Sequence, residues 1–269
     1  MIQPEDRQAP VTAYFQDDAP FWESVYAAEG VFSEIHRERK KRAMRLIGRL
    51  DIGPGARVLE AGCGAGLTAV ELARRGFLVE ATDATPAMIE ITRRNGETAG
   101  VASRLAARVA DVHALDYATG TFDLVLALGL IPWLHDPEGA LREMARVLRP
   151  GGYMLVNSDN RGRLNHLLDP ITNPTLAPLR RLVRRHPKRA VSTTTTWNRR
   201  FDRQIQHAGM KRLRGLTFGF GPFTFFGRRV FSEAIGVGLH ERLQELSDEG
   251  TPFLRWTGAQ YLVLAQKEF

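Results

Sequence analysis

The sequence predicts an α/β fold with a doubly wound, mostly parallel sheet of seven strands. Three observations predict it. Short apolar runs of strand length alternate with segments of helical spacing, a glycine-rich loop joins the first run to a helix, and the second and third runs each lead into an aspartate. Such alternation is typical of parallel sheets covered by helices on both faces, in which ligands bind at the carboxyl ends of the strands.

The seven predicted strands are rich in apolar residues and are bounded by glycine, proline or charged residues. They cover residues 57–61, 77–82, 104–110, 121–128, 153–157, 213–220 and 260–265. The helices predicted between them cover residues 67–75, a segment with Pro86 in its first turn, residues 137–148, a segment that Thr196 caps and that ends at 207, and a helical insert at about 228–246.

The chain is expected to be a single domain with four parts. Residues 1–50 form an N-terminal helical cap, and residues 51–159 form the core with the first five strands. Residues 160–209 form a basic helical insert or lid, and residues 210–269 contain the last two strands with a further helical insert.

The N-terminal part begins with several aromatic residues, including Tyr14, and continues as a predicted helix. Ile35, Ala43 and Leu46 lie on the apolar side of this helix. The charged run 37–42 is therefore expected to be mostly exposed to solvent.

Composition narrows the class of protein. The chain has 269 residues and 43% hydrophobic content, enough to bury a large core. No run approaches the length of a transmembrane helix and the first ten residues lack a signal-peptide core, so we expect a cytoplasmic protein. The single cysteine excludes an intramolecular disulfide, and no metal site is expected.

The net charge of +7 is unevenly distributed. Residues 161–214 contain fourteen Lys or Arg and two acids, a local charge of +12 against −5 for the rest of the chain. Within residues 161–189, leucines interleave with arginines. Such a segment suits either a lid that also touches an anionic membrane or a solvated lid over a soluble substrate.

The glycine loop at residues 60–66, Glu-Ala-Gly-Cys-Gly-Ala-Gly, predicts the kind of ligand. A dinucleotide-binding loop of the type G-x-G-x-x-G requires glycine where this chain has Leu67. Glu60 would repel a pyrophosphate and suits a ligand that carries a cation. Both residues oppose an oxidoreductase, and Cys63 is better explained as a small spacer than as a nucleophile.

This E-x-G-x-G-x-G pattern resembles motif I of the class I methyltransferases that depend on S-adenosyl-L-methionine (SAM). The segments Phe122-Asp123-Leu124-Val125 and 148–152, Leu-Arg-Pro-Gly-Gly, resemble further landmarks of that family and follow in the right order. The chain is most similar to the small-molecule type, and its core to the ubiquinone and menaquinone biosynthesis enzymes. The resemblance implies a Rossmann-like methyltransferase fold with SAM as cofactor.

By position, the resemblance also implies which residues bind the cofactor. The glycine loop would hold the methionine end, Asp83 would accept hydrogen bonds from the ribose hydroxyls, and Asp111 would accept one from the adenine amino group. Tyr14 would fold over the cofactor, or would be a surface aromatic residue. The complete set of implied residues is Tyr14, Glu60, Ala61, Gly62, Cys63, Gly64, Gly66, Asp83, Ala84, Met88, Asp111, Val112 and Leu128.

The catalytic residue is less clear, because the chain departs from the family after the fourth strand. Many small-molecule relatives carry Glu-His or His-His there, where this chain has proline and Trp133, and His135 lies two residues further on. His135, Asp159 and Tyr14 are the candidates for a base, although His135 could face solvent and Asp159 could cap a helix. Trp133, Asp159 and Phe223 are expected to contact the acceptor.

The expected function is SAM-dependent methylation of a small molecule, with O-methylation of an aromatic, quinol-like or natural-product acceptor favoured. N- or C-methylation of a lipidic or isoprenoid acceptor at a membrane surface, RNA methylation, and a non-catalytic SAM-binding module are the alternatives. Nucleic acid is disfavoured as a partner, because the Asn/Asp-Pro-Pro-aromatic motif of base methyltransferases is missing after the fourth strand. The oligomeric state is left open.

Overall fold

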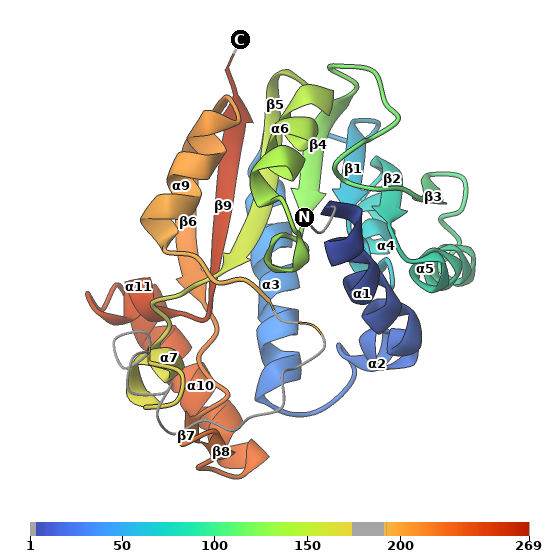
Figure 1. The fold of residues 1–269 in the computed structure, drawn as a ribbon. Coiled ribbons are helices and arrows are strands. Elements are labelled where there is room, and N and C mark those ends of the chain that lie inside the picture. Colours follow the sequence, from blue (N-terminus) through green and yellow to red (C-terminus); the bar gives the residue numbers. More distant parts are fainter. Residues whose placement is uncertain (1–3, 174–190, 192, 269) are drawn as a thin grey trace.

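A seven-stranded sheet forms the centre of the molecule in the computed structural model, which describes residues 4–173, 191 and 193–268 (Figure 1). The strand order is β3-β2-β1-β4-β5-β9-β6. The strands are β1 (Arg57–Ala61), β2 (Leu78–Asp83), β3 (Leu105–Val109), β4 (Phe122–Ala127), β5 (Leu148–Asp159), β6 (Met210–Phe218) and β9 (Gln260–Lys267). A separate hairpin consists of β7 (Thr224–Phe225) and β8 (Arg228–Arg229).

The sheet is parallel from β3 to β5, and only β9 runs against its neighbours. Val58 of β1 pairs with Val79 of β2 on one side and with Leu124 of β4 on the other. The order of the strands therefore reverses beside β1, which is where parallel sheets bind their ligands. The predicted doubly wound, mostly parallel sheet is confirmed.

Helices cover both faces of the sheet and its carboxyl edge. They are α1 (Pro4–Asp17), α2 (Ala19–Ser24), α3 (Val31–Ile47), α4 (Leu67–Arg74), α5 (Pro86–Thr98), the 3₁₀ helix η1 (Ile131–Trp133), α6 (Pro137–Val147), α7 (Leu164–Leu168), α9 (Asn198–His207), α10 (Glu233–Asp248) and α11 (Leu254–Thr257). In the part of the chain that the structure describes, no helix has the length and apolarity needed to cross a membrane.

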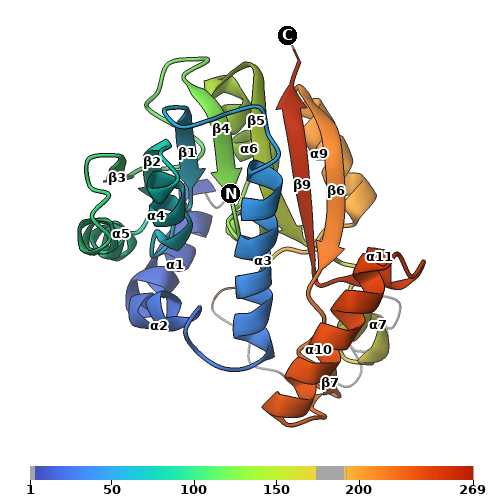
Figure 2. The same ribbon diagram turned by 180° about the vertical axis from the view of Figure 1, so that it is seen from behind.

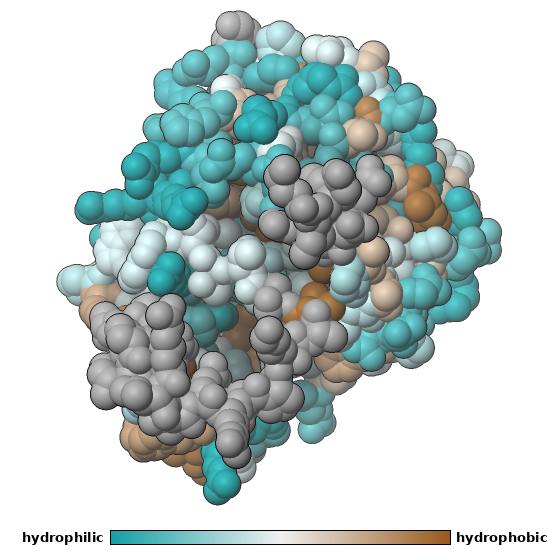
Figure 3. All heavy atoms as spheres, viewed as in Figure 1, coloured by the Kyte–Doolittle hydropathy of each residue, from teal (hydrophilic) through white to brown (hydrophobic). Residues whose placement is uncertain are grey.

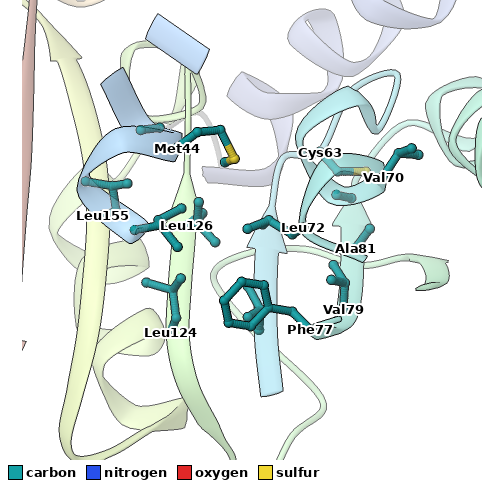
Figure 4. Packing of buried hydrophobic residues seen from close by; sticks show 14 of the residues in the cluster. Met44, Cys63, Val70, Leu72, Phe77, Val79, Ala81, Leu124, Leu126 and Leu155 are labelled. Atoms are coloured by element: carbon teal, nitrogen blue, oxygen red, sulfur yellow. The ribbon is translucent and has the colours of Figure 1, made fainter. Parts of the chain in front are cut away.

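Alternate residues of the strands face two separate hydrophobic clusters. Helices α3, α4 and α5 cover one face, which Figure 2 shows from outside, and α6 and α9 cover the other. Figure 4 shows the first cluster, in which Met44 of α3 and Leu72 of α4 pack against strand residues such as Val79, Leu126 and Leu155.

The N-terminal helices α1 and α2 form a cap at the carboxyl edge of the sheet. Phe15 and Trp22 pack with Ala65 of the glycine loop and with Met88 and Ile91 of α5. The cap therefore lies against the loop that follows β1, as an N-terminal helical lid is expected to do.

Two local predictions were wrong. Thr196 does not cap a helix, because its backbone N–H donates to the carbonyl of Asp159 and its carbonyl accepts from Arg161. The helix begins at Asn198 instead. Strand β5 begins at Leu148 rather than at residue 153, and a register shift absorbs the Pro-Gly-Gly segment opposite β4.

Half of the charged run 37–42 on α3 is buried, contrary to expectation. Glu38, Arg39 and Arg42 are buried because α3 has the sheet on one side and α10 on the other. The Arg42 guanidinium pairs with Glu38 and with Asp248 of α10. A run of charged residues in the sequence therefore did not mean that this face of α3 is exposed to solvent.

Candidate active site

A cavity of about 810 Å³ lies at the carboxyl edge of the sheet. The glycine loop and the ends of β2 and β3 form its floor at one end, and the cap helices and α3 form its sides. The segments after β4 and β5, together with residues near the β7–β8 hairpin, line the other end. In the described part of the chain, all these segments thus meet around one ligand-sized space.

The glycine loop has left-handed backbone at every second position, which explains its spacing. Gly62, Gly64 and Gly66 have φ values of 68°, 54° and 72°, a region that side chains with a Cβ rarely adopt. A Cβ at Gly62 would lie 2.8 Å from Leu130, and one at Gly66 would lie 2.6 Å from Thr92. A Cβ at Gly64 meets nothing within 4 Å, so bare backbone faces the cavity there.

Asp83, at the end of β2, fixes the glycine loop and also lines the cavity. One carboxylate oxygen accepts from the N–H of Gly64 at 3.0 Å, and the other from the N–H of Thr85 at 2.9 Å. Burial raises the pKa of Asp83, while these N–H donors lower it. The carboxylate oxygens lie at the wall of the cavity, where a hydroxyl group of a ligand could donate to them.

Asp111 and Val112 line the cavity at the end of β3. The Asp111 carboxylate lies 2.7 Å from Nδ1 of His113 and accepts from the His113 N–H. Partial burial raises the pKa of Asp111, but hydrogen bonds and positive charge from His113 outweigh it, so the net shift is downward. The other ring nitrogen of His113 faces the carbonyl of Asp136 at 3.1 Å, so the ring is held at both ends.

Glu60 does not line the cavity. Glu60 is 3% exposed. Its side chain extends from β1 beneath the loop and meets Thr68 and Ala69 at the start of α4. Burial raises the pKa of Glu60 to about 8, although hydrogen bonding to Ala69 and Thr68 and the charge of Lys40 oppose this. In this arrangement Glu60 supports the loop from below.

Arg39 lines the cavity from α3, and the sequence analysis missed it. Arg39 is only 7% exposed, and its Nε has no hydrogen-bond partner in the described part of the chain. A Cβ built on Gly129, which follows β4, would come within 2.6 Å of the guanidinium. Helical spacing was the available signal, since Arg39 lies four residues from both Ile35 and Ala43 of the apolar stripe.

Aromatic rings close the cavity between the cap and β4. Trp133 of η1 stacks on Tyr14 of α1 with ring centroids 5.7 Å apart, and Phe15 meets the same indole edge-on at 5.0 Å. His135 does not point freely into solvent, because it stacks on His113 at 4.2 Å and its Nδ1 lies 3.2 Å from Gln8. His135 does not line the cavity.

Asp159 and Arg163 line the far end of the cavity, and Arg229 and Glu233 are further charged lining residues there. Nη1 of Arg163 lies 4.0 Å from the Asp159 carboxylate, too far for a direct hydrogen bond, and Nε of Arg163 donates to His166 at 2.9 Å. Burial raises the pKa of Asp159, and the charges of Arg163 and Arg39 lower it. Asp159 caps no helix, because α7 begins after Arg163.

The structure brings most of the predicted site residues together. Those that line the cavity are Tyr14, Gly62, Cys63, Gly64, Asp83, Ala84, Met88, Asp111, Val112, Leu128, Trp133, Asp159 and Phe223. Ala61 and Gly66 lie beside it in the loop without lining it. Residues 161–189 are the basic segment for which a membrane contact is expected, and from residue 174 onward this segment lies outside the described residues. Among the residues that are described, no group of His, Cys, Asp or Glu could hold a metal ion.

The strand order and the helices on both faces of the sheet are those of a Rossmann-like methyltransferase fold. The chain resembles a crystal structure of the [4+2]-cyclase SpnF, with a TM-score of 0.63, 17% identity, and coverage of 96% of this chain and 95% of that one. It also resembles geranyl diphosphate methyltransferase in complex with GPP and sinefungin, with a TM-score of 0.64, 16% identity, and coverage of 97% and 99%.

The sequence comparisons find a methyltransferase domain in the central part of the chain. Residues 59–156 match the family model of a methyltransferase domain. A ubiquinone biosynthesis O-methyltransferase of Methylocella silvestris is 41% identical over 107 residues, 40% of this chain and 41% of that protein. One from Xanthomonas oryzae pv. oryzae is 35% identical over 135 residues, 50% and 55% of the two proteins.

The methyltransferase GfsG of Streptomyces halstedii is 36% identical over 113 residues, 42% of this chain and 41% of that protein. The chain thus spans about half the length, or less, of these curated relatives. The stretch that matches the family model carries the glycine loop, Asp83 and Asp111. The chain thus contains a methyltransferase domain at residues 59–156.

Proposed function

We propose that the chain transfers a methyl group from SAM to a hydroxyl group of a small, largely apolar acceptor. The observation that carries the proposal is that a SAM-type glycine loop and the half-buried Asp159 face the same cavity. Cofactor groups would occupy the end near β1–β3, and the acceptor the end near Asp159 and Phe223.

The residues at the first end fit SAM group by group. The bare backbone at Gly64 admits close approach, and Asp83 offers acceptors to the ribose hydroxyls. Asp111 and Val112 would border the adenine. Arg39 presents a buried cation with an unsatisfied Nε, which suits the methionine carboxylate. When bound, SAM supplies a methyl group that its sulfonium has already activated.

The protein's own part in the reaction is to orient the acceptor, exclude water and hold one proton. The Asp159 carboxylate would take the proton of the acceptor hydroxyl as the oxygen–carbon bond forms. Its environment supports this role, because burial raises its pKa towards that of a useful base. Arg163, 4.0 Å away, would stabilise the developing oxyanion. The Tyr14–Trp133 stack would shield the reacting groups from water.

Calorimetry and a turnover assay test the proposal. We expect the chain to bind S-adenosylhomocysteine and not NADH, and to transfer label from methyl-labelled SAM to members of a phenol and quinol library. Amine and isoprenoid acceptors in the same screen test N- and C-methylation. Binding of S-adenosylhomocysteine with no transfer to any acceptor would favour a non-catalytic module, and binding of NADH alone would overturn the cofactor assignment.

A further inference from the structure

An exposed apolar patch lies on the β7–β8 hairpin and the start of α10. It consists of Phe225, Phe226, Val230, Phe231 and Ile235, each between 43% and 60% exposed. Large apolar side chains so close together on a surface usually mark a site of interaction rather than chance exposure. Figure 3 shows apolar surface at the lower edge of the molecule, in the region where Figure 1 places β7 and β8.

The patch is held in place from inside the protein. Asp169 is fully buried, and its carboxylate accepts from the Thr224 hydroxyl at 2.7 Å and from the Gly227 N–H at 3.0 Å. Burial opposes ionisation of Asp169, but these hydrogen bonds, with one from Ile171, lower its pKa overall. The hairpin is thus anchored to the segment after α7.

The turn of the hairpin contains a residue that is costly for the backbone. Phe226 has φ of 49°, the left-handed region where glycine or asparagine is favoured, and Gly227 follows with φ of 73°. The Phe226 ring is 60% exposed and packs edge-on against Phe225 alone among the aromatic residues described. Neither intramolecular burial nor turn geometry explains an aromatic residue there.

The charges around the patch indicate the partner. Arg228 is exposed at the hairpin and forms no ion pair with a described residue, while Arg229 pairs with Glu233. A symmetric dimer through the patch would bring the cations of two copies together. An anionic surface with an apolar interior satisfies both the arginines and the phenyl rings, as in proteins that lie on membranes.

We propose that this patch docks on an anionic lipid bilayer, so that the acceptor end of the cavity opens towards the membrane. Phe223, Arg229 and Phe231 line the cavity, which places the docking surface at its acceptor end. An apolar acceptor could then enter from the lipid without crossing water. The docking itself depends only on the patch, whereas the acceptor route rests on the function proposed above.

Flotation of the full chain with lipid vesicles tests the docking. We expect the chain to float with vesicles of phosphatidylcholine mixed with phosphatidylglycerol, less with phosphatidylcholine alone, and less at high salt. The double variant Phe225→Ser/Phe226→Ser should bind roughly tenfold more weakly or worse. The matched control is Phe253→Ser/Trp256→Ser, which removes equally exposed rings (57% and 55%) beyond the other end of α10.

Equal flotation of wild type and the hairpin variant would overturn the docking, as would no flotation of the wild type. A dimer in solution that the hairpin variant dissociates would assign the patch to self-association instead. Calorimetry with S-adenosylhomocysteine and turnover of a water-soluble phenol separate the two proposals. The hairpin variant should keep both, and loss of flotation with normal turnover would leave the proposed function standing.

Discussion

Replacement of Arg39 gives the sharpest test of the cofactor site, because binding and stability should respond in opposite ways. In the ligand-free protein, Arg39→Met removes a buried cation that forms no ion pair with a described residue. We therefore expect the free energy of unfolding to stay the same or rise. Loss of a charge-assisted contact to the methionine carboxylate should cost about 2–3 kcal/mol of binding. That corresponds to a roughly 30- to 150-fold weaker affinity for S-adenosylhomocysteine.

Two controls make the result specific to the carboxylate. Adenosine lacks the methionine part, so Arg39→Met should bind it as well as the wild type does. Arg42 lies three residues away on the same helix and is equally buried, but it pairs with Glu38 and Asp248. Arg42→Met should therefore lower stability and leave affinity unchanged. Calorimetry and urea unfolding measure both quantities, and an Arg39→Met variant that binds normally or unfolds like Arg42→Met would refute the reasoning.

Three further predictions concern Glu60, Asp159 and the glycine loop. Burial raises the pKa of Glu60 in the folded state to about 8, well above the ordinary value of about 4.5 for a glutamate, so the native state holds a proton that the unfolded chain loses between these pH values. The free energy of unfolding should therefore fall as pH rises through this window. In Glu60→Gln the fall should be smaller by up to a few kcal/mol, measured by urea unfolding at pH 5 and 8.5. An equal fall in the variant and the wild type would contradict this. Asp159→Asn should reduce kcat by about 10²–10⁴ and abolish the rise of kcat with pH, with S-adenosylhomocysteine affinity intact; a preserved pH profile would exclude Asp159 as the base. Gly64→Ala should impair cofactor binding more than stability, whereas Gly66→Ala should mainly lower stability through its clash with Thr92; calorimetry and thermal unfolding of the pair decide, and the opposite ranking would contradict the loop assignment.

The fold could be predicted because its signals are local. The strand at 57–61 is an apolar run between turn residues, and its structure has the same bounds. The N-terminal half of β5 could not be predicted, because Pro150 and the glycines after it look like a stop. Pairing of Leu148 with Phe122 of β4 keeps that segment in the sheet.

The cofactor end of the site could also be predicted from the sequence, because acids at the carboxyl ends of parallel strands lie at the same edge of the sheet. The acceptor end depends on segments distant in sequence, such as Asp159, Arg163 and Phe223, which only the folded chain brings together. Arg39 could not be told apart from its neighbours, because all six residues of the run 37–42 are charged. Burial of that helix face depends on how α3 packs against α10, which no local pattern contains.

The position of β9 has a consequence for how the chain is assembled during synthesis. β9 follows β6 in sequence but lies between β5 and β6 in space, and among the described strands β6 pairs with β9 alone. While the chain grows, β6 leaves the ribosome with no edge to join, and β5 keeps one side open. Both must wait until the residues of β9 have been made. Because β9 pairs Asp159 with Gln260, the acceptor end of the cavity is completed at that last step, well after the glycine loop can form.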